Sequence, residues 1–112
     1  MKIFAVILVS IACTSPAAAQ PYVGKWAPNQ KSCSDEGLDS NVEFKKGLFI
    51  AHESFCKTSS LKRPSAASWS ANAACEGEGE QWSLRLDFSV SGDRLLLSQD
   101  GGPAAKLIRC IR

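Results

Sequence analysis

The stretch Gln81–Val90, with the sequence QWSLRLDFSV, has an apolar residue at every second position. In an extended chain these apolar side chains share one face, and Ser83, Arg85, Asp87 and Ser89 share the other. A period of two residues is typical of a β-strand with one buried face, whereas a helix would spread the same side chains around its whole surface. The stretch therefore predicts a half-buried strand and favours an all-β fold.

The sequence on both sides of this stretch has the same character. Turns are expected at Ser91–Asp93, at Asp100–Pro103, at Lys46–Gly47 and in the glycine-rich segment 76–80. Helix signals are confined to one possible turn at 34–37. Further strands are expected at 42–44, 48–51, 67–75, 94–98 and 104–111, the last with Leu107, Arg109 and Ile111 on one side. About six to eight short strands joined by tight turns predict an all-β barrel or sandwich.

The N-terminal segment 1–19 reads as a secretory signal. Lys2 supplies a positive charge, an apolar run follows at 3–12, and Ala17–Ala19 offers small residues for cleavage before Gln20. The run is shorter than the roughly 20 apolar residues of a transmembrane helix. Lipidation of Cys13 is the alternative, and either route exports the chain. We therefore expect a single domain at 20–112, located in the periplasm or outside the cell.

Four cysteines remain after this cleavage, namely Cys33, Cys56, Cys75 and Cys110. An even number of cysteines in a short exported chain predicts two disulfides, which small domains often need for stability. No Cys-x-x-Cys spacing is present, so neither a metal site nor any other cofactor is expected. The count alone leaves all three pairings open.

The charge balance argues against nucleic-acid binding. The full chain has 13 basic and 11 acidic residues, and the loss of Lys2 with the leader leaves twelve basic residues. Nucleic-acid-binding domains usually show a basic excess or a clustered basic face. The basic cluster in this chain, Lys57 with Lys62 and Arg63, is small.

The mature N-terminus contains YVGKWAP at 22–28. The Gly24-Lys25-Trp26 segment resembles the first-strand motif of the lipocalin-like (calycin) superfamily and of the small bacterial metalloprotease inhibitors that share its barrel. The resemblance implies a small antiparallel up-and-down barrel, in which Gly24 lets the first strand bend and Trp26 plugs the floor. It also implies that Arg109 or Arg112 packs on the Trp26 ring as a cation–π contact.

Barrel closure suggests one arrangement of the disulfides. In a meandering barrel the last strand pairs with the first, so a Cys33–Cys110 bridge would seal that seam. A Cys56–Cys75 bridge would then join the middle strands. The other two pairings remain open at this point.

No catalytic residue is expected. His52-Glu53 looks like the start of the zinc-protease motif His-Glu-x-x-His, but Cys56 stands at the second histidine position and a strand is expected where the motif needs a helix. His52 is the only histidine, and the Gly-x-Ser-x-Gly elbow of serine hydrolases is absent. The paired acids, at 35–36 and 76–80, fall in expected turns. His52 is interpreted as a solvent-facing or hydrogen-bonded residue on a strand.

The interior of so small a barrel is expected to be filled by side chains. The expected filling residues are Trp26, Phe44, Ile50, Trp82, Leu84, Leu86, Phe88, Leu95 and Leu97. Binding is then assigned to a polar, basic loop at 57–65, where Leu61 offers an apolar anchor and Lys62 and Arg63 meet acidic groups. The N-terminal stub 20–23 is the next candidate.

The preferred function is a monomeric, secreted protein-binding module, most concretely an inhibitor of a hydrolase such as a protease or lysozyme. A rigid scaffold suits binding because little ordering entropy is lost on association. A carrier of small apolar ligands and a structural envelope protein are the alternatives.

Overall fold

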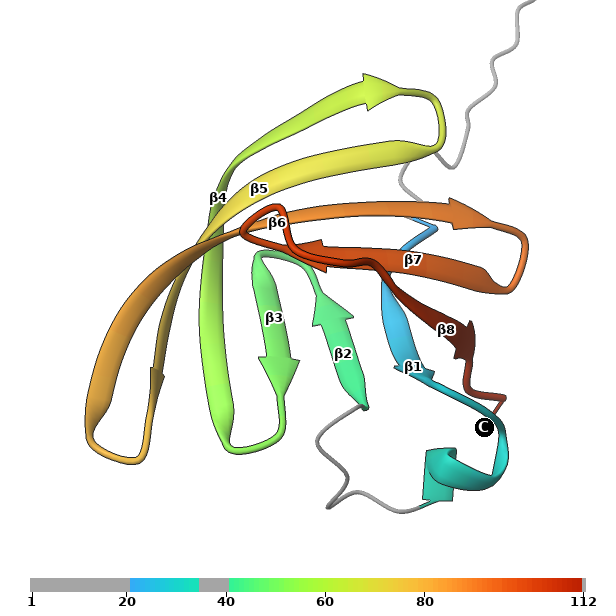
Figure 1. The fold of residues 1–112 in the computed structure, drawn as a ribbon, viewed down its shortest axis with the longest axis horizontal. Coiled ribbons are helices and arrows are strands. Elements are labelled where there is room, and N and C mark those ends of the chain that lie inside the picture. Colours follow the sequence, from blue (N-terminus) through green and yellow to red (C-terminus); the bar gives the residue numbers. More distant parts are fainter. Residues whose placement is uncertain (1–20, 35–40, 112) are drawn as a thin grey trace, which may run out of the picture.

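The computed structural model describes residues 21–34 and 41–111, which form a closed antiparallel β-barrel of eight strands (Figure 1). The prediction of a small all-β barrel with six to eight strands and two disulfides is confirmed. The leader expected at 1–19 and its expected cleavage site lie outside the described residues, as do Cys13 and Arg112.

Each strand of the barrel pairs with the next in the chain, and β8 returns to pair with β1. The elements are β1 (Gly24–Ala27), the 3-10 helix η2 (Lys31–Ser34), β2 (Val42–Lys45), β3 (Leu48–Ala51), β4 (Ser54–Ser65), β5 (Ser68–Gly77), β6 (Glu80–Ser91), β7 (Arg94–Gln99) and β8 (Ala105–Arg109). The single helical turn expected at 34–37 lies earlier, at Lys31–Ser34; of the expected segment, residues 35–37 lie outside the described part of the chain.

The barrel closes where β1 meets β8. Trp26 pairs with Arg109 and Ala27 pairs with Ile108. The Cys33–Cys110 disulfide lies just beyond this seam, with 5.6 Å between its Cα atoms. The Cys56–Cys75 disulfide joins residues that stand directly opposite each other on β4 and β5. The pairing suggested by barrel closure is therefore the one observed.

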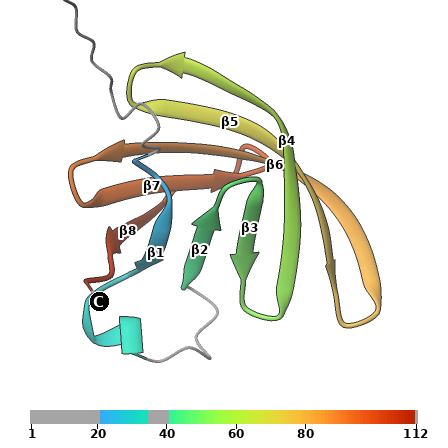
Figure 2. The same ribbon diagram turned by 180° about the vertical axis from the view of Figure 1, so that it is seen from behind.

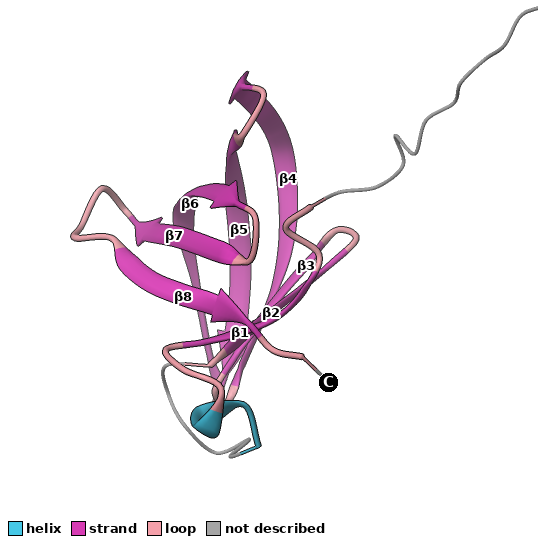
Figure 3. Ribbon diagram, turned by 90° about the vertical axis from the view of Figure 1, so that its right-hand side faces the viewer, coloured by secondary structure: helices cyan, strands magenta, loops and turns pink. Residues whose placement is uncertain are grey.

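Three strands are much longer than the rest and extend beyond the barrel wall. β4, β5 and β6 have twelve, ten and twelve residues. β6 pairs with β7 only from Leu86 onward, so the hairpin of β5 and β6 projects past the end of β7 (Figure 2). β4 pairs with β3 only over Ser54–Lys57. The end of the β4–β5 hairpin that contains the turn between Ser65 and Ser68 therefore also stands away from the barrel (Figure 3).

Aromatic rings fill the barrel core. Tyr22 is buried and makes edge contacts with Phe44, Trp69 and Phe88, at centroid distances of 5.4, 5.1 and 4.9 Å. The remaining large buried residues are Trp26, Phe49, Leu86, Leu95, Leu97 and Leu107. No helix in the described part of the chain has the length and apolar character needed to cross a membrane.

Several core expectations are wrong. Ile50 is half-buried and Phe49 is buried instead, because Phe49 pairs with Phe44 and Cys56 on the inward face while Ile50 faces the other side. Trp82 shares the face of Leu86 but lies beyond the end of β7, so it stays 39% exposed. Leu84, next along that strand, is half-buried at the margin of the core.

The C-terminal end of the chain and the segment 57–65 also differ from expectation. β8 ends at Arg109, so Ile111 is 73% exposed instead of sharing a strand face with Leu107. The expected loop at 57–65 is most of strand β4, which pairs with β5 through two irregularities in register. Its polar composition reflects exposure, because the strand leaves the barrel wall there.

Candidate functional site

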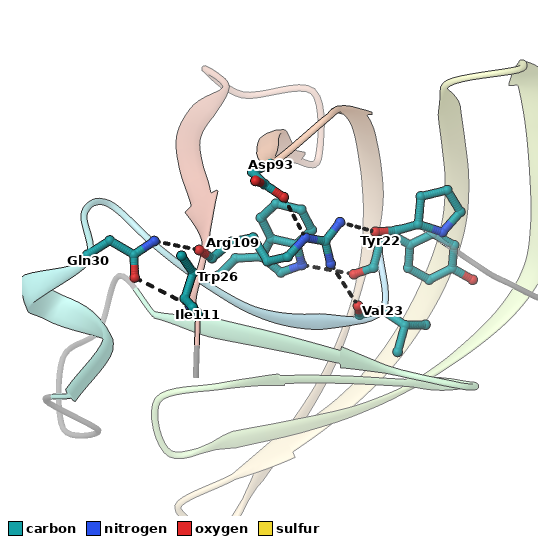
Figure 4. A network of polar contacts seen from close by, with 8 residues as sticks. Tyr22, Val23, Trp26, Gln30, Asp93, Arg109 and Ile111 are labelled. Carbon is teal, nitrogen blue, oxygen red and sulfur yellow. Dashed lines mark hydrogen bonds and ion pairs between the residues drawn. The ribbon is translucent and has the colours of Figure 1, made fainter.

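The Trp26–Arg109 contact lies at the barrel seam (Figure 4). Trp26 is fully buried, and its indole Nε1 donates a hydrogen bond to the Tyr22 carbonyl at 2.8 Å. The Arg109 Cζ lies 4.4 Å from the centroid of the Trp26 ring. Residues directly opposite on an antiparallel pair project to the same face, which explains why the arginine meets the ring. Gly24 leaves room for this side chain, since a Cβ there would lie 3.3 Å from Arg109 Nη1.

Arg109 also holds the N-terminal segment against the barrel. Its Nη2 donates to the Pro21 carbonyl at 2.8 Å and its Nη1 to the Val23 carbonyl at 3.2 Å. Its Nε contacts Asp93 Oδ1 at 3.2 Å. Each of the three guanidinium nitrogens therefore has a partner within the chain, and this arrangement stabilises the fold rather than presenting a ligand site.

The N-terminal stub at 20–23 is consequently a poor binding surface, because its central residue, Tyr22, is buried. Tyr22 is 5% exposed and anchors in the aromatic core, and burial raises the pKa of its hydroxyl. Pro21 and Val23 on either side are exposed, but their carbonyls accept from Arg109. Gln20 lies outside the described residues.

The surface formed by Leu61, Lys62 and Arg63 lies on the part of β4 that has left the barrel wall. All residues from Ser59 to Ser65 are exposed, and Leu61 is 46% exposed. Arg63 is partly engaged within the chain, because its Cζ lies 5.1 Å from the Trp69 ring and its Nη2 donates to the Ala66 carbonyl at 2.7 Å. Leu61 and Lys62 are therefore the members of this group best placed to meet another molecule.

Arg85 joins this surface, although the sequence analysis did not select it. Lys62 pairs with Ser70, and Arg85 pairs with Asn72 on the far side of β5. Together with Ser60 they line a hollow of about 270 Å³. Arg85 also makes an ion pair with Asp87 at 3.2 Å. The alternation at Gln81–Val90 already placed Arg85 on the polar face, but only the register across β5 brings it beside Lys62.

His52 does not lie on a strand. It occupies the turn between β3 and β4, and its Nε2 lies 3.4 Å from Glu53 Oε2. The segment is a hairpin and Cys56 is in a disulfide, so the helical spacing of a zinc-protease site is not formed. Across the described ranges no group of three or more histidine, cysteine or acidic side chains could hold a metal ion.

An apolar hollow lies along β6, β7 and β8. It measures about 480 Å³, and its lining combines Val90, Leu95, Leu96 and Leu107 with the basic residues Arg94 and Lys106. Leu96 is 45% exposed there. The hollow is open to the surface, unlike the enclosed interior pocket of a ligand-carrying barrel.

No protein family, no curated protein and no solved structure matches this chain.

Proposed function

We propose that the chain is an exported, non-enzymatic module that binds another protein, most concretely as an inhibitor of a hydrolase such as a protease or lysozyme. The observation that carries the proposal is the exposed outer half of β4. Leu61 offers an apolar contact there, and Lys62 offers a charge beside it. Interfaces commonly combine an apolar anchor with charged groups that fix orientation.

The chemistry of this surface favours an acidic group on the partner. Lys62 and Arg85 flank the 270 Å³ hollow, and hydroxyl and amide groups from Ser60, Ser70 and Asn72 complete its lining. A carboxylate placed there would receive charge-assisted hydrogen bonds, which are stronger than neutral ones. A hydrolase with acidic residues near its substrate cleft is a suitable partner.

The rigidity of the β4–β5 hairpin and the presence of two disulfides support the proposal of an exported protein-binding module. The Cys56–Cys75 disulfide holds the base of the β4–β5 hairpin, so little ordering entropy would be lost when the surface binds. Two disulfides in a small domain are typical of an oxidising, exported environment. The leader at 1–19 and the Gly24-x-Trp26 resemblance to metalloprotease-inhibitor barrels are consistent with that environment.

The test is a titration of the exported protein into secreted metalloproteases, serine proteases and lysozyme, with residual activity as the readout. A triple variant with alanine at Leu61, Lys62 and Arg63 should lose most of the inhibition. The control variant replaces Lys45 and Lys46, which are exposed on another part of the surface, and removes the same charge. Equal inhibition by the triple variant would rule out this surface, and no inhibition of any hydrolase would rule out the inhibitor role.

The apolar hollow along β6, β7 and β8 favours one alternative, a small apolar ligand bound at the surface. Replacing the exposed Leu96 by lysine would remove an apolar side chain and add a third basic group beside Arg94 and Lys106, and should weaken binding of a fluorescent apolar probe. Probe binding that survives this change would show that the hollow is not the ligand site, and failure of the parent protein to bind the probe would remove the carrier alternative.

A further inference from the structure

Strand β6 has an open edge outside the barrel. Its last contact on the β7 side is made by Arg85, whose N–H donates to Asp100 Oδ1 and whose carbonyl accepts from the Asp100 N–H, both at 2.8 Å. Regular pairing with β7 starts at Leu86. From Leu84 back to Glu80, β6 therefore has a neighbour only on the β5 side within residues 21–34 and 41–111.

The backbone groups that face this open edge can be identified. In an antiparallel strand the N–H and C=O of one residue point to the same side of the strand, and those of the next residue point to the other side. Every second residue therefore points its backbone groups the same way. The register between β5 and β6 runs without a bulge from Ser68–Ser89 to Gly77–Glu80. Since Arg85 faces the β7 side, Gln81 and Ser83 face it too, and in the described part of the chain no residue pairs with their backbone N–H and C=O groups there.

The corresponding edge of β4 is protected against strand addition. Beyond Thr58, whose N–H donates to the Gly47 carbonyl, β4 has two register irregularities. It also carries Lys62, Arg63 and Pro64. Bulges, charged residues and proline are the devices by which edge strands avoid pairing with other chains. The β6 edge at Gln81, Trp82 and Ser83 is regular, uncharged and free of proline.

Both faces of the sheet beside the β6 edge offer contacts to an added strand. Trp82 is 39% exposed on the inward face. Beside the edge, a hollow of about 420 Å³ is lined by Gln81, Trp82 and Ser83 of β6 together with Phe55, Lys57, Ala74, Cys75 and Glu76. Phe55 is 41% exposed in it. Because side chains alternate along a strand, one set of partner side chains would meet Trp82 and the other would lie beside Gln81 and Ser83 at the β6 side of the hollow.

The end of the β5–β6 hairpin is acidic. Glu76, Glu78 and Glu80 are all exposed. Glu53 reaches the same place from the β3–β4 turn, and its hydrogen bond and negative charge raise the pKa of Glu78. A partner with positive charge would relieve this repulsion, and a cation could also stack on the exposed Trp82 ring.

We propose that the β6 edge at Gln81–Ser83 binds an extended, basic segment of another protein as an additional strand of the sheet. Main-chain hydrogen bonds supply affinity in this mode, and alternate side-chain pockets supply selectivity. The site is separate from the Leu61–Arg63 surface and does not rest on the inhibitor function.

The first test leaves the protein unchanged and varies a fluorescent probe peptide of alternating lysine and valine. Anisotropy should show that the parent protein binds this peptide and binds the matching glutamate–valine peptide at least about tenfold more weakly, since like charges oppose association. Two N-methylated versions of the lysine–valine peptide test the main-chain hydrogen bonds. One version carries a methyl group on the backbone nitrogen of every lysine, and the other carries it on the backbone nitrogen of every valine. One of the two methylated versions should lose binding, since only one row of N–H groups faces β6; equal binding by both would overturn the proposal.

The second test changes one backbone donor of the protein. Ser83→Pro removes the N–H that faces the open edge, a position where proline is tolerated because no ladder bond to β5 is lost. Ser83→Ala is the matched control, since it removes the same hydroxyl and keeps the N–H. We expect about a tenfold weaker peptide affinity for Ser83→Pro than for Ser83→Ala, from one lost hydrogen bond and the steric block.

Folding of both variants is checked by circular dichroism and thermal unfolding, and the methylated peptides decide the question if Ser83→Pro does not fold. Equal affinity of folded Ser83→Pro and Ser83→Ala would overturn the proposal. A second pair of results would also overturn the proposal. The peptide would fail to bind the parent protein, and sedimentation would show a dimer of the parent that the Ser83→Pro substitution dissociates. In that case the edge would serve a second copy of this chain.

Discussion

Arg109 and Trp26 stand directly opposite each other where the barrel closes, with 4.4 Å between the guanidinium carbon and the centroid of the indole ring. The pair joins the last strand to the first and, through the carbonyls of Pro21 and Val23, holds the N-terminal segment in place. Closure of the barrel and burial of its largest core residue therefore depend on the same contact.

Replacing Trp26 by alanine should reduce the free energy of unfolding by about 3–5 kcal/mol, because a fully buried tryptophan leaves a cavity and exposes its neighbours. Trp82→Ala is the matched control. Trp82 is 39% exposed at the projecting hairpin, and its loss should cost about 1 kcal/mol or less. Denaturant unfolding measures both, and similar losses at the two positions would contradict the burial assigned to Trp26.

Gly24→Ala should destabilise the protein by about 1–3 kcal/mol, the usual range for a strained backbone conformation. Gly24 has φ of 141°, and a Cβ would press on Arg109 Nη1 at 3.3 Å. In an Arg109→Met background part of this cost should disappear, because the guanidinium is gone. A double-mutant cycle by denaturant unfolding measures the coupling, and strict additivity would show that Gly24 and Arg109 act independently.

The two disulfides should contribute unequally. The Cys33–Cys110 bridge spans a sequence separation of 77 residues and Cys56–Cys75 spans 19. On the chain-entropy account, removing both cysteines of the longer bridge should cost about 4–5 kcal/mol and removing those of the shorter one about 3 kcal/mol. Paired serine substitutions, followed by denaturant unfolding under oxidising conditions, test this order. A larger loss for the Cys56–Cys75 variant would show that native packing, not loop length, dominates.

Stability should fall at high pH because of Tyr22. Burial raises the pKa of its hydroxyl above the ordinary value of 10.0, so the folded state holds this proton more tightly than the unfolded state. The associated stability is present below the unfolded pKa and is lost as pH rises through the folded value. Tyr22 is the only tyrosine, so tyrosinate absorbance reports its titration directly.

Tyr22→Phe is the control for this pH dependence. The variant keeps the aromatic contacts with Phe44, Trp69 and Phe88 and removes the ionisable group. Its unfolding free energy should fall less steeply than that of the parent as pH rises above about 10, where other groups also titrate. Parallel curves for the two proteins would show that Tyr22 ionises without cost in the folded state.

Much of the strand pattern was predictable because it depends on local alternation. The strands around Phe44, Phe49, Phe88 and Leu95 are where the sequence predicts them, and their turns contain the expected glycines. The candidate binding segment at 57–65 was identified by its composition, but its secondary structure was not, because a loop was expected where β4 lies. The exposed residues from Ser59 to Ser65 are mostly polar or basic and resemble a loop, and only pairing with β5 makes them a strand.

The sequence by itself determined an all-β chain, because alternation of apolar residues dictates which side of each strand is buried. Strand lengths beyond the barrel were decided by tertiary pairing, since a strand continues only while a neighbour satisfies its backbone groups. That pairing brings Arg85 beside Lys62 across β5, and among the described residues it leaves Gln81 and Ser83 without a neighbour on the β7 side. It also exposes Trp82 while Trp26, a residue of the same type, is fully buried, because burial depends on which strands lie over a side chain.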